Sequence, residues 1–212
     1  MSKLPNNYNF EIYKSIVRIR EVATIIGKKP RVALQLPDGF MLFSILISDI
    51  LETFAGCECV ILGDITYGAC CIDDLGSKSL ECDLIIHYGH SCLVPVTETC
   101  VKSLYVFVDI EVDITHLIKT IEFNFTNEKL YIMGSIQFNN SVFLCKRELA
   151  EKGFDVKIPQ TKPRSHGEVL GCTSPIIDAD GSIVIFICDG RFHMESAMIA
   201  NPNLTFYQYN HI

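Results

Sequence analysis

Two loop cysteines, Cys70 and Cys172, are the residues of this sequence best placed to do chemistry. Each lies in a glycine-containing loop that follows an apolar, strand-like run, 59–62 for Cys70 and 155–158 for Cys172. A thiolate is both a nucleophile and the usual ligand of iron–sulfur clusters. Glycine permits the tight turns that leave room above a sheet edge. The residues alone leave two roles equally open for both cysteines, a cluster or metal ligand and a small core hydrophobe. Cys188, which ends a later strand, is a minor candidate.

Two histidine-containing segments form the second group of candidates. His87-Tyr88-Gly89-His90 ends one predicted strand, and Asp189-Gly190-Arg191-Phe192-His193 ends another. The arginine of the second segment suits bidentate binding of a carboxylate. Each histidine alone fits a hydrogen-bonded structural role at a strand end, but their repeat-related positions favour a pocket. The pocket candidates are therefore His87, His90, Asp189, Gly190, Arg191 and His193.

Apolar periodicity predicts strands that alternate with helices along the chain. Asn9 is expected to cap a first helix from Phe10 to Ile26, which Gly27 ends. The further helices are predicted over 43–54, 113–121 and 138–149, with a short one starting at Asp73. The predicted strands cover 31–36, 59–62, 83–86, 104–108, 130–133, 155–158, 182–187 and 204–207. This alternation is typical of parallel sheets covered by helices.

The pattern repeats after about 100 residues, the size of a small domain. In both halves a strand–helix–strand unit leads into a cysteine loop, and the next strand ends in a glycine–histidine cluster. We therefore predict an α/β fold with two homologous three-layer domains, 1–112 and 113–212, related by pseudo-symmetry. If the halves pack around that axis, Cys70 and Cys172 would converge on one site.

Composition excludes several classes of protein. The net charge of −7 and the lack of a basic stripe argue against a nucleic-acid binder. No apolar run is long enough to span a bilayer, and the N-terminus has no signal-peptide pattern. We expect a cytoplasmic protein whose ten cysteines are reduced thiols or metal ligands. Their spacing disfavours a structural zinc site, and no glycine-rich phosphate loop is present.

These motifs together resemble the family of diphthamide synthase catalytic first subunits, the 2-(3-amino-3-carboxypropyl)histidine synthases. The resemblance covers nearly the whole chain. The segments that carry it are 4–12, 33–39, 63–74, 87–94, 104–110, 167–175 and 189–203. The His-Tyr-Gly-His-Ser-Cys and Asp-Gly-Arg-Phe-His runs are its most specific parts.

The resemblance implies an activity, cofactors and partners. Members of this family hold a 4Fe-4S cluster through three cysteines, one from each of three homologous domains. An electron from the cluster cleaves S-adenosylmethionine, and the 3-amino-3-carboxypropyl radical adds to a histidine of elongation factor 2. The family works as a heterodimer with a related second subunit and takes electrons from a small metal-binding protein. The protein's part is to hold the cluster and exclude water.

The same resemblance assigns roles to individual residues. Cys70 matches the first cluster ligand of the family and Cys172 the second. Gln35, His87, His90 and the segment 189–193 match regions around the pocket, so they are assigned to S-adenosylmethionine binding or pocket lining.

The sequence departs from the family pattern at Ile212, which lies near the end of the expected second domain. The third domain, with the third cysteine ligand, is not in this sequence. Three interpretations compete. The protein is a truncated or split enzyme, or it receives a third ligand from another chain or from Cys188, or it is a non-catalytic scaffold subunit. On chemistry alone, the adjacent thiols of Cys70 and Cys71 leave a thiol redox protein as a further hypothesis.

Overall fold

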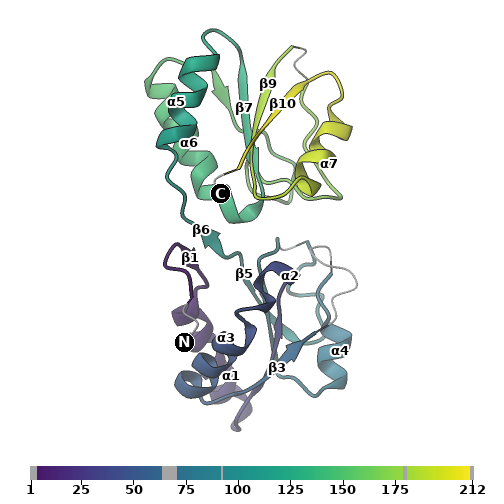
Figure 1. The fold of residues 1–212 in the computed structure, drawn as a ribbon. Helices are drawn as coiled ribbons and strands as arrows, with labels where there is room; N and C mark the ends of the chain where they lie inside the picture. Colours follow the sequence, from purple (N-terminus) through teal and green to yellow (C-terminus); the bar gives the residue numbers. More distant parts are fainter. Residues whose placement is uncertain (1–3, 64–70, 92, 179–180, 211–212) are drawn as a thin grey trace. The chain divides into compact units, whose positions relative to one another are not determined.

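The computed structural model describes residues 4–63, 71–91, 93–178 and 181–210. The chain divides into two compact units, Met1–Val108 and Asp109–Ile212. Each unit is described by itself below, as unit 1 and unit 2 (Figure 1).

Unit 1 is built on a four-stranded, fully parallel sheet with the strand order β3-β2-β4-β5. Figure 1 shows α1 and α3 on one face of this sheet and α4 on the other, which makes three layers. The elements in chain order are β1 (Tyr8–Asn9), α1 (Ile12–Ile26), β2 (Arg31–Gln35), α2 (Asp38–Met41), α3 (Ser44–Ala55), β3 (Glu58–Leu62), α4 (Asp74–Ser79), β4 (Leu84–Tyr88) and β5 (Lys102–Val106).

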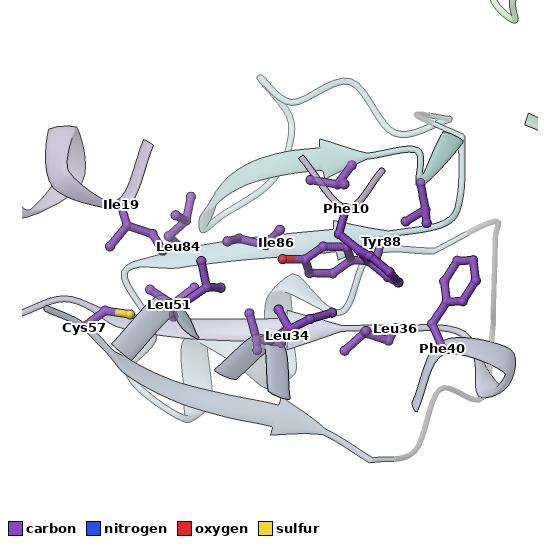
Figure 2. Packing of buried hydrophobic residues seen from close by; sticks show 14 of the residues in the cluster. Phe10, Ile19, Leu34, Leu36, Phe40, Leu51, Cys57, Leu84, Ile86 and Tyr88 are labelled. Atoms are coloured by element: carbon purple, nitrogen blue, oxygen red, sulfur yellow. The ribbon is translucent and has the colours of Figure 1, made fainter. Parts of the chain in front are cut away.

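The main core of unit 1 lies between its sheet and helices α1 and α3 (Figure 2). Side chains alternate along the strands, so Leu34 and Ile86 face this core while Ala33 and Ile85 face a second cluster on the opposite side. At the carboxyl end of the strands, Phe10 packs edge-on against Phe40, with ring centroids 5.7 Å apart. Both faces of the sheet are thus buried, as expected of a parallel sheet.

The first helix begins later than the sequence predicted, and Asn9 does not cap it. Asn9 belongs to β1, and its side-chain oxygen accepts the backbone N–H of Glu11 at 3.0 Å. Glu11 takes the N-cap position in the left-handed conformation, with φ of 45°. The cause is tertiary, because Phe10 is buried in the core and the chain must turn sharply after it.

Unit 2 also contains a four-stranded, fully parallel sheet, with the order β10-β9-β7-β8. Helices α5 and α6 lie on one face and α7 on the other (Figure 1). The elements are β6 (Asp109–Ile110), α5 (Thr115–Asn124), β7 (Leu130–Gly134), the 3₁₀ helix η2 (Ile136–Phe138), α6 (Asn139–Glu151), β8 (Val156–Lys157), β9 (Ile183–Ile187), α7 (Phe192–Ala200) and β10 (Thr205–Tyr209).

The two sheets have the same topology when their strands are numbered within each unit. In both, the first and third strands are central, the second flanks the first, and the fourth flanks the third. This confirms the predicted repeat of parallel α/β units. In both units the chain continues in opposite directions across the sheet from the first strand and from the third, and in folds of this kind ligands bind at the carboxyl ends of these two strands.

The second strand of unit 2 is interrupted, which the sequence did not predict. After Val156 and Lys157 pair with β7, the chain leaves the sheet and returns at Glu168, which bridges Gly134 at the end of β7. The N–H of Gly167 donates to the carbonyl of Pro159 at 2.7 Å and closes this excursion. Residues 159–167 therefore form a closed loop at the carboxyl edge of the sheet, here named the edge loop.

Within the described part of the chain, none of the helices is both long enough and apolar enough to cross a membrane.

Candidate functional site

Cys172 lies at the tip of a tight turn just after the edge loop. Leu170 and Thr173 exchange backbone hydrogen bonds of 3.2 Å in both directions, so Gly171 and Cys172 project from the turn. The thiol is exposed, and the hydroxyl of Thr173 donates to its sulfur at 3.7 Å. An exposed sulfur on a hydrogen-bonded turn is in a suitable position to ligate a metal cluster.

An aromatic ring from α7 supports this turn. A Cβ atom added to Gly171 would overlap the ring of Phe192, so only glycine fits at position 171 without movement. Phe192 remains 69% exposed, although it is a large apolar side chain. The ring centroid of His193 lies 5.5 Å from that of Phe192 in an edge-on arrangement. The segment 189–193 therefore contacts the cysteine turn directly through Phe192.

Asn201, at the end of α7, fixes the chain that follows the turn. Its side-chain oxygen accepts the N–H of Ile177 at 2.7 Å, and its amide nitrogen donates to the carbonyls of Pro175 and Ala197 at 2.9 Å each. Asn201 is buried. The Cys172 turn is thus held on one side by Phe192 and on the other by Asn201.

The remaining predicted residues of unit 2 surround the start of α7. His193 is half-buried, and burial lowers the pKa of its imidazole, while Asp189 acts in the opposite direction. Gly190 contributes its carbonyl, which accepts the thiol of Cys188 at 2.7 Å. Arg191 is exposed, and its closest carboxylate is that of Glu195 at 3.8 Å. The structure therefore places Arg191 on the surface and not in a closed carboxylate-binding pocket.

In unit 1, Gln35 binds the backbone that follows the predicted Cys70 loop. Its amide nitrogen donates to the carbonyl of Cys71 at 3.1 Å, and its oxygen accepts the N–H of Asp73 at 3.0 Å. Gln35 is almost fully buried at the end of β2. It thereby fixes the backbone of residues 71–73. Cys70 itself lies outside the described residues, so its predicted ligand role and its convergence with Cys172 stay predictions.

His87 and His90 are in contact at the end of β4. Nε2 of His87 lies 3.2 Å from Nδ1 of His90, and the His87 side chain is 1% exposed. Burial, assisted by the charge of His90, lowers the pKa of His87 to about 3. Nδ1 of His87 is buried and finds no hydrogen-bond partner among the described residues. His87 is therefore neutral at pH 7 and retains an unused ring nitrogen.

Each unit contains a close contact between a glycine and an aromatic ring, but the two contacts join different elements. A Cβ atom on Gly89, which lies between His87 and His90, would overlap the ring of Phe40, and Gly89 has φ of +70°. In unit 1 the glycine follows the third strand of the sheet and the ring follows the first, whereas in unit 2 Gly171 follows the second strand and Phe192 follows the third. The signal was present in the sequence as a glycine and an aromatic residue in neighbouring strand-end segments, but spacing alone did not show that they touch.

Sequence reasoning also missed Arg164, which lies in the edge loop. Its side chain is 3% exposed, yet none of its three guanidinium nitrogens has a hydrogen-bond partner among the described residues. One arginine in a polar loop gives no sequence signal of burial, because arginine is usually exposed.

The described residues include no group of three or more cysteine, histidine or acidic side chains arranged to hold a metal ion. Cys172 fits one thiolate ligand of a cluster, since it is exposed and accepts a hydrogen bond at sulfur. The described part of unit 2 thus offers one ligand, and a cluster site needs further thiolates.

The described chain is thus a protein of two parallel α/β units, in which the exposed thiols of Cys71 and Cys172 each follow the second strand of a sheet. Residues 36–212 match the family described as "Putative diphthamide synthesis protein". The 2-(3-amino-3-carboxypropyl)histidine synthase subunit 1 of Nematostella vectensis is 51% identical over 209 residues, covering 98% of this chain and 43% of that protein. The protein of the same name from Schizosaccharomyces pombe is 50% identical over 216 residues, covering 98% and 48%. The chain therefore belongs to the diphthamide synthesis protein family.

Solved structures agree with this assignment. The crystal structure of Dph2 from Pyrococcus horikoshii with a 4Fe-4S cluster has a TM-score of 0.75 and 27% sequence identity, covering 91% of this chain and 58% of that chain. A second crystal structure of Dph2 from Pyrococcus horikoshii has a TM-score of 0.69 at 28% identity, covering 84% and 52%. The chain spans about half the length of the curated relatives it matches.

Proposed function

We propose that this chain takes part in the transfer of the 3-amino-3-carboxypropyl group from S-adenosylmethionine to a histidine of elongation factor 2, the first step of diphthamide biosynthesis. The observation that carries the proposal is the exposed Cys172 turn, which Phe192 and Asn201 support from α7. Family membership adds support, because relatives about 50% identical are named as histidine synthase subunits.

In this proposal Cys70 and Cys172 are ligands of a 4Fe-4S cluster, which when bound would supply the electron that cleaves the sulfonium. The related Dph2 crystal structure with a 4Fe-4S cluster supports this cofactor. Gln35 contributes by fixing the backbone just after Cys70. His87 contributes a neutral ring, which does not repel a positively charged sulfonium as an imidazolium would. Asp189, Gly190, Arg191, His193 and His90 are proposed to line the same pocket.

The proposed partners are elongation factor 2 as substrate, a related second subunit, and a small metal-binding electron donor. The name "subunit 1" of the relatives supports an assembly with at least one further subunit. We also propose a cytoplasmic location, since none of the eight described cysteines forms a disulfide, as expected of a reducing compartment.

The test is iron and acid-labile sulfide content after anaerobic reconstitution of the chain with its related second subunit. Cys70→Ala and Cys172→Ala should each lose the cluster. Cys100→Ala, which removes another exposed thiol, should retain it. A complex that forms but contains no iron would contradict the catalytic proposal and favour the scaffold interpretation. Iron retained in both ligand variants would refute the assignment of these two cysteines.

A further inference from the structure

Two cysteine side chains, Cys57 and Cys59, are in contact in the core of unit 1 and are named here the thiol pair. Their Sγ atoms lie 3.7 Å apart. Both are free thiols, of which Cys57 is fully buried and Cys59 is partly buried. The proposed function uses neither of them. Two thiols in contact are able to react with each other as well as with an external oxidant.

The backbone explains why these two sulfur atoms meet. Cys59 belongs to β3, and Cys57 precedes that strand by one residue, so only Glu58 separates them. Residues two apart in an extended chain project to the same face, and both cysteines pack in the same core cluster. Two residue steps span at most about 7 Å between Cα atoms, which is the upper limit for a disulfide.

The thiol pair is separate from the candidate site. It lies at the amino end of β3, whereas the predicted Cys70 loop follows the carboxyl end of that strand. Figure 2 shows Cys57 at the opposite end of the core from Phe40, which packs at the carboxyl end of the strands. Chemistry at the thiol pair is therefore distinct from cluster ligation.

Helix α3 fixes the backbone of the thiol pair but leaves the sulfur atoms weakly bound. Oε1 of Glu52 accepts the N–H of Cys59 at 2.8 Å. The thiol of Cys59 donates only to the carbonyl of Ser48, at 3.9 Å. Since a thiol is a weak hydrogen-bond donor, little is lost when this sulfur turns fully toward Cys57.

The thiol pair accommodates one negative charge more readily than two. The hydrogen bond between the thiols lowers the pKa of Cys57 and raises the pKa of Cys59, and the carboxylate of Glu52 opposes ionisation of both. A metal ion would require two thiolates in these apolar surroundings. Disulfide formation requires one thiolate at a time and leaves a neutral group. The thiol pair therefore fits a disulfide better than a metal ion.

We propose that the thiol pair is a redox-modification site, at which hydrogen peroxide joins Cys57 and Cys59 in a reversible disulfide. The ionised thiol attacks one peroxide oxygen, the O–O bond breaks, and the products are a sulfenic acid and hydroxide, which takes up a proton. The second sulfur then attacks the sulfenic sulfur. The S–S bond forms as the S–O bond breaks, and the second thiol proton leaves in water. Two electrons pass from the thiols to one peroxide, which becomes two waters.

The size of the ring makes this disulfide reversible. A bond between Cys57 and Cys59 encloses only Glu58, and small, strained rings of this kind are readily reduced by other thiols. The free thiols in the structure are thus the expected state without oxidant. Condensation with a neighbouring thiol also protects a sulfenic acid from irreversible oxidation.

The test detects the disulfide by mass spectrometry on the full chain. After treatment with hydrogen peroxide, the free thiols are alkylated in denaturant. A protease that cuts after acidic residues then separates the pair at Glu58 and releases peptides 53–58 and 59–64, each with one cysteine of the pair and no other. The two peptides should be recovered as one linked species, increased about tenfold or more over the untreated chain, and separated by dithiothreitol.

The variants identify the sulfur atoms involved. Cys57→Ser and Cys59→Ser should each abolish the linked species and leave the remaining cysteine of the pair without a disulfide partner. Cys82→Ser, which removes another buried thiol of unit 1, should retain it. The linked species in the unmodified chain is a readout that does not depend on the folding of any variant. Alkylated Cys57 and Cys59 in the peroxide-treated unmodified chain would overturn the proposal.

A second measurement tests reversibility. The oxidised chain is equilibrated in glutathione buffers, and the linked species is measured at each ratio of thiol to disulfide. At the reducing ratio of the cytosol the thiol pair should be fully reduced, as expected of a strained disulfide. A linked species that persists at this ratio would identify a structural disulfide and overturn the reversible modification.

Discussion

Gln35 of β2 and His87 of β4 are register partners on the two central strands of unit 1. Gln35 binds the backbone of residues 71–73, and His87 contacts His90 in the next loop. Register partners on parallel strands project to the same face of the sheet. Two loops that are distant in sequence are therefore fixed from adjacent positions at one sheet edge.

Replacing Gln35 should loosen the segment that follows residue 70. Gln35→Leu leaves the carbonyl of Cys71 and the N–H of Asp73 without their partner, so the free energy of unfolding of unit 1 should fall by about 1–3 kcal/mol. Gln35→Glu, which keeps the acceptor for Asp73 but loses the donor, serves as the matched comparison. Urea denaturation followed by circular dichroism measures both. Stability of Gln35→Leu equal to that of the unmodified chain would contradict the structural role.

The depressed pKa of His87 makes stability fall in acid. Its pKa is about 3 when folded, below the usual 6.5, so between these values the unfolded chain binds the extra proton. The free energy of unfolding should therefore rise with pH from 3 to 6.5, by at most about 1.4 kcal/mol per pH unit from this one group. His87→Gln should flatten this slope, whereas His166→Gln, at an exposed position, should retain it. If the free energy of unfolding has the same slope against pH in both variants, the low pKa assigned to His87 is refuted.

Adding one methyl group at Gly171 should disturb the Cys172 turn. In Gly171→Ala the new Cβ would overlap the ring of Phe192, and the turn must shift. The rate of alkylation of Cys172, followed by peptide mass spectrometry, should change by about threefold or more. Phe192→Ala combined with Gly171→Ala should return the rate toward that of Phe192→Ala alone. An additive effect in the double variant would show that the ring is not the cause.

Removing the side chain of Asn201 should detach the chain after the Cys172 turn from α7. Asn201→Ala leaves the N–H of Ile177 and the carbonyl of Pro175 without this partner, and we expect a loss of about 1–3 kcal/mol in unit 2. The control is Asn203→Ala at an exposed position nearby, with an expected change within about 0.5 kcal/mol. Denaturant midpoints compare the two, and equal midpoints would contradict the role of Asn201.

The strands and most helices were predictable because the sequence signals for them, apolar runs and glycines at helix ends, are local. Buried parallel strands such as β4 and β9 read as short apolar runs, and Gly27 and Gly56 end helices in the left-handed conformation. The start of α1 was not predictable, because burial of Phe10 overrides the capping preference of Asn9. A loop after residue 158 was predicted, but the return of the chain to the sheet at Glu168 was not, since it depends on a long-range bridge to Gly134.

The site was predictable by residue type but not by contact. The sequence identified Gln35, His87 and Cys172, and the structure shows that Gln35 acts on backbone atoms and that the His87 ring is buried. It did not identify Arg164, since burial of a loop arginine is decided by the fold of the loop around it. Arg191 had the better sequence context and proved to be exposed.

The two units use different means to hold the loop beside their first central strand. In unit 1 the last residue of that strand, Gln35, does so with its side chain, whereas in unit 2 the equivalent Gly134 does so through backbone hydrogen bonds with Gly167 and Val169. A side-chain anchor is removed by a single base change in a codon, but a backbone anchor survives any substitution that the local geometry accepts. A Cβ at Gly134 would overlap the carbonyl of Ile187, so Gly134 itself does not accept substitution. Its partner Val169 does accept substitution, because only its backbone takes part in the hydrogen bond. Mutational scanning should therefore find that neither Gln35 nor Gly134 tolerates substitution, for opposite reasons. Substitution of Gln35 removes the hydrogen bonds of its side chain, whereas substitution of Gly134 adds a side chain where there is no space for one.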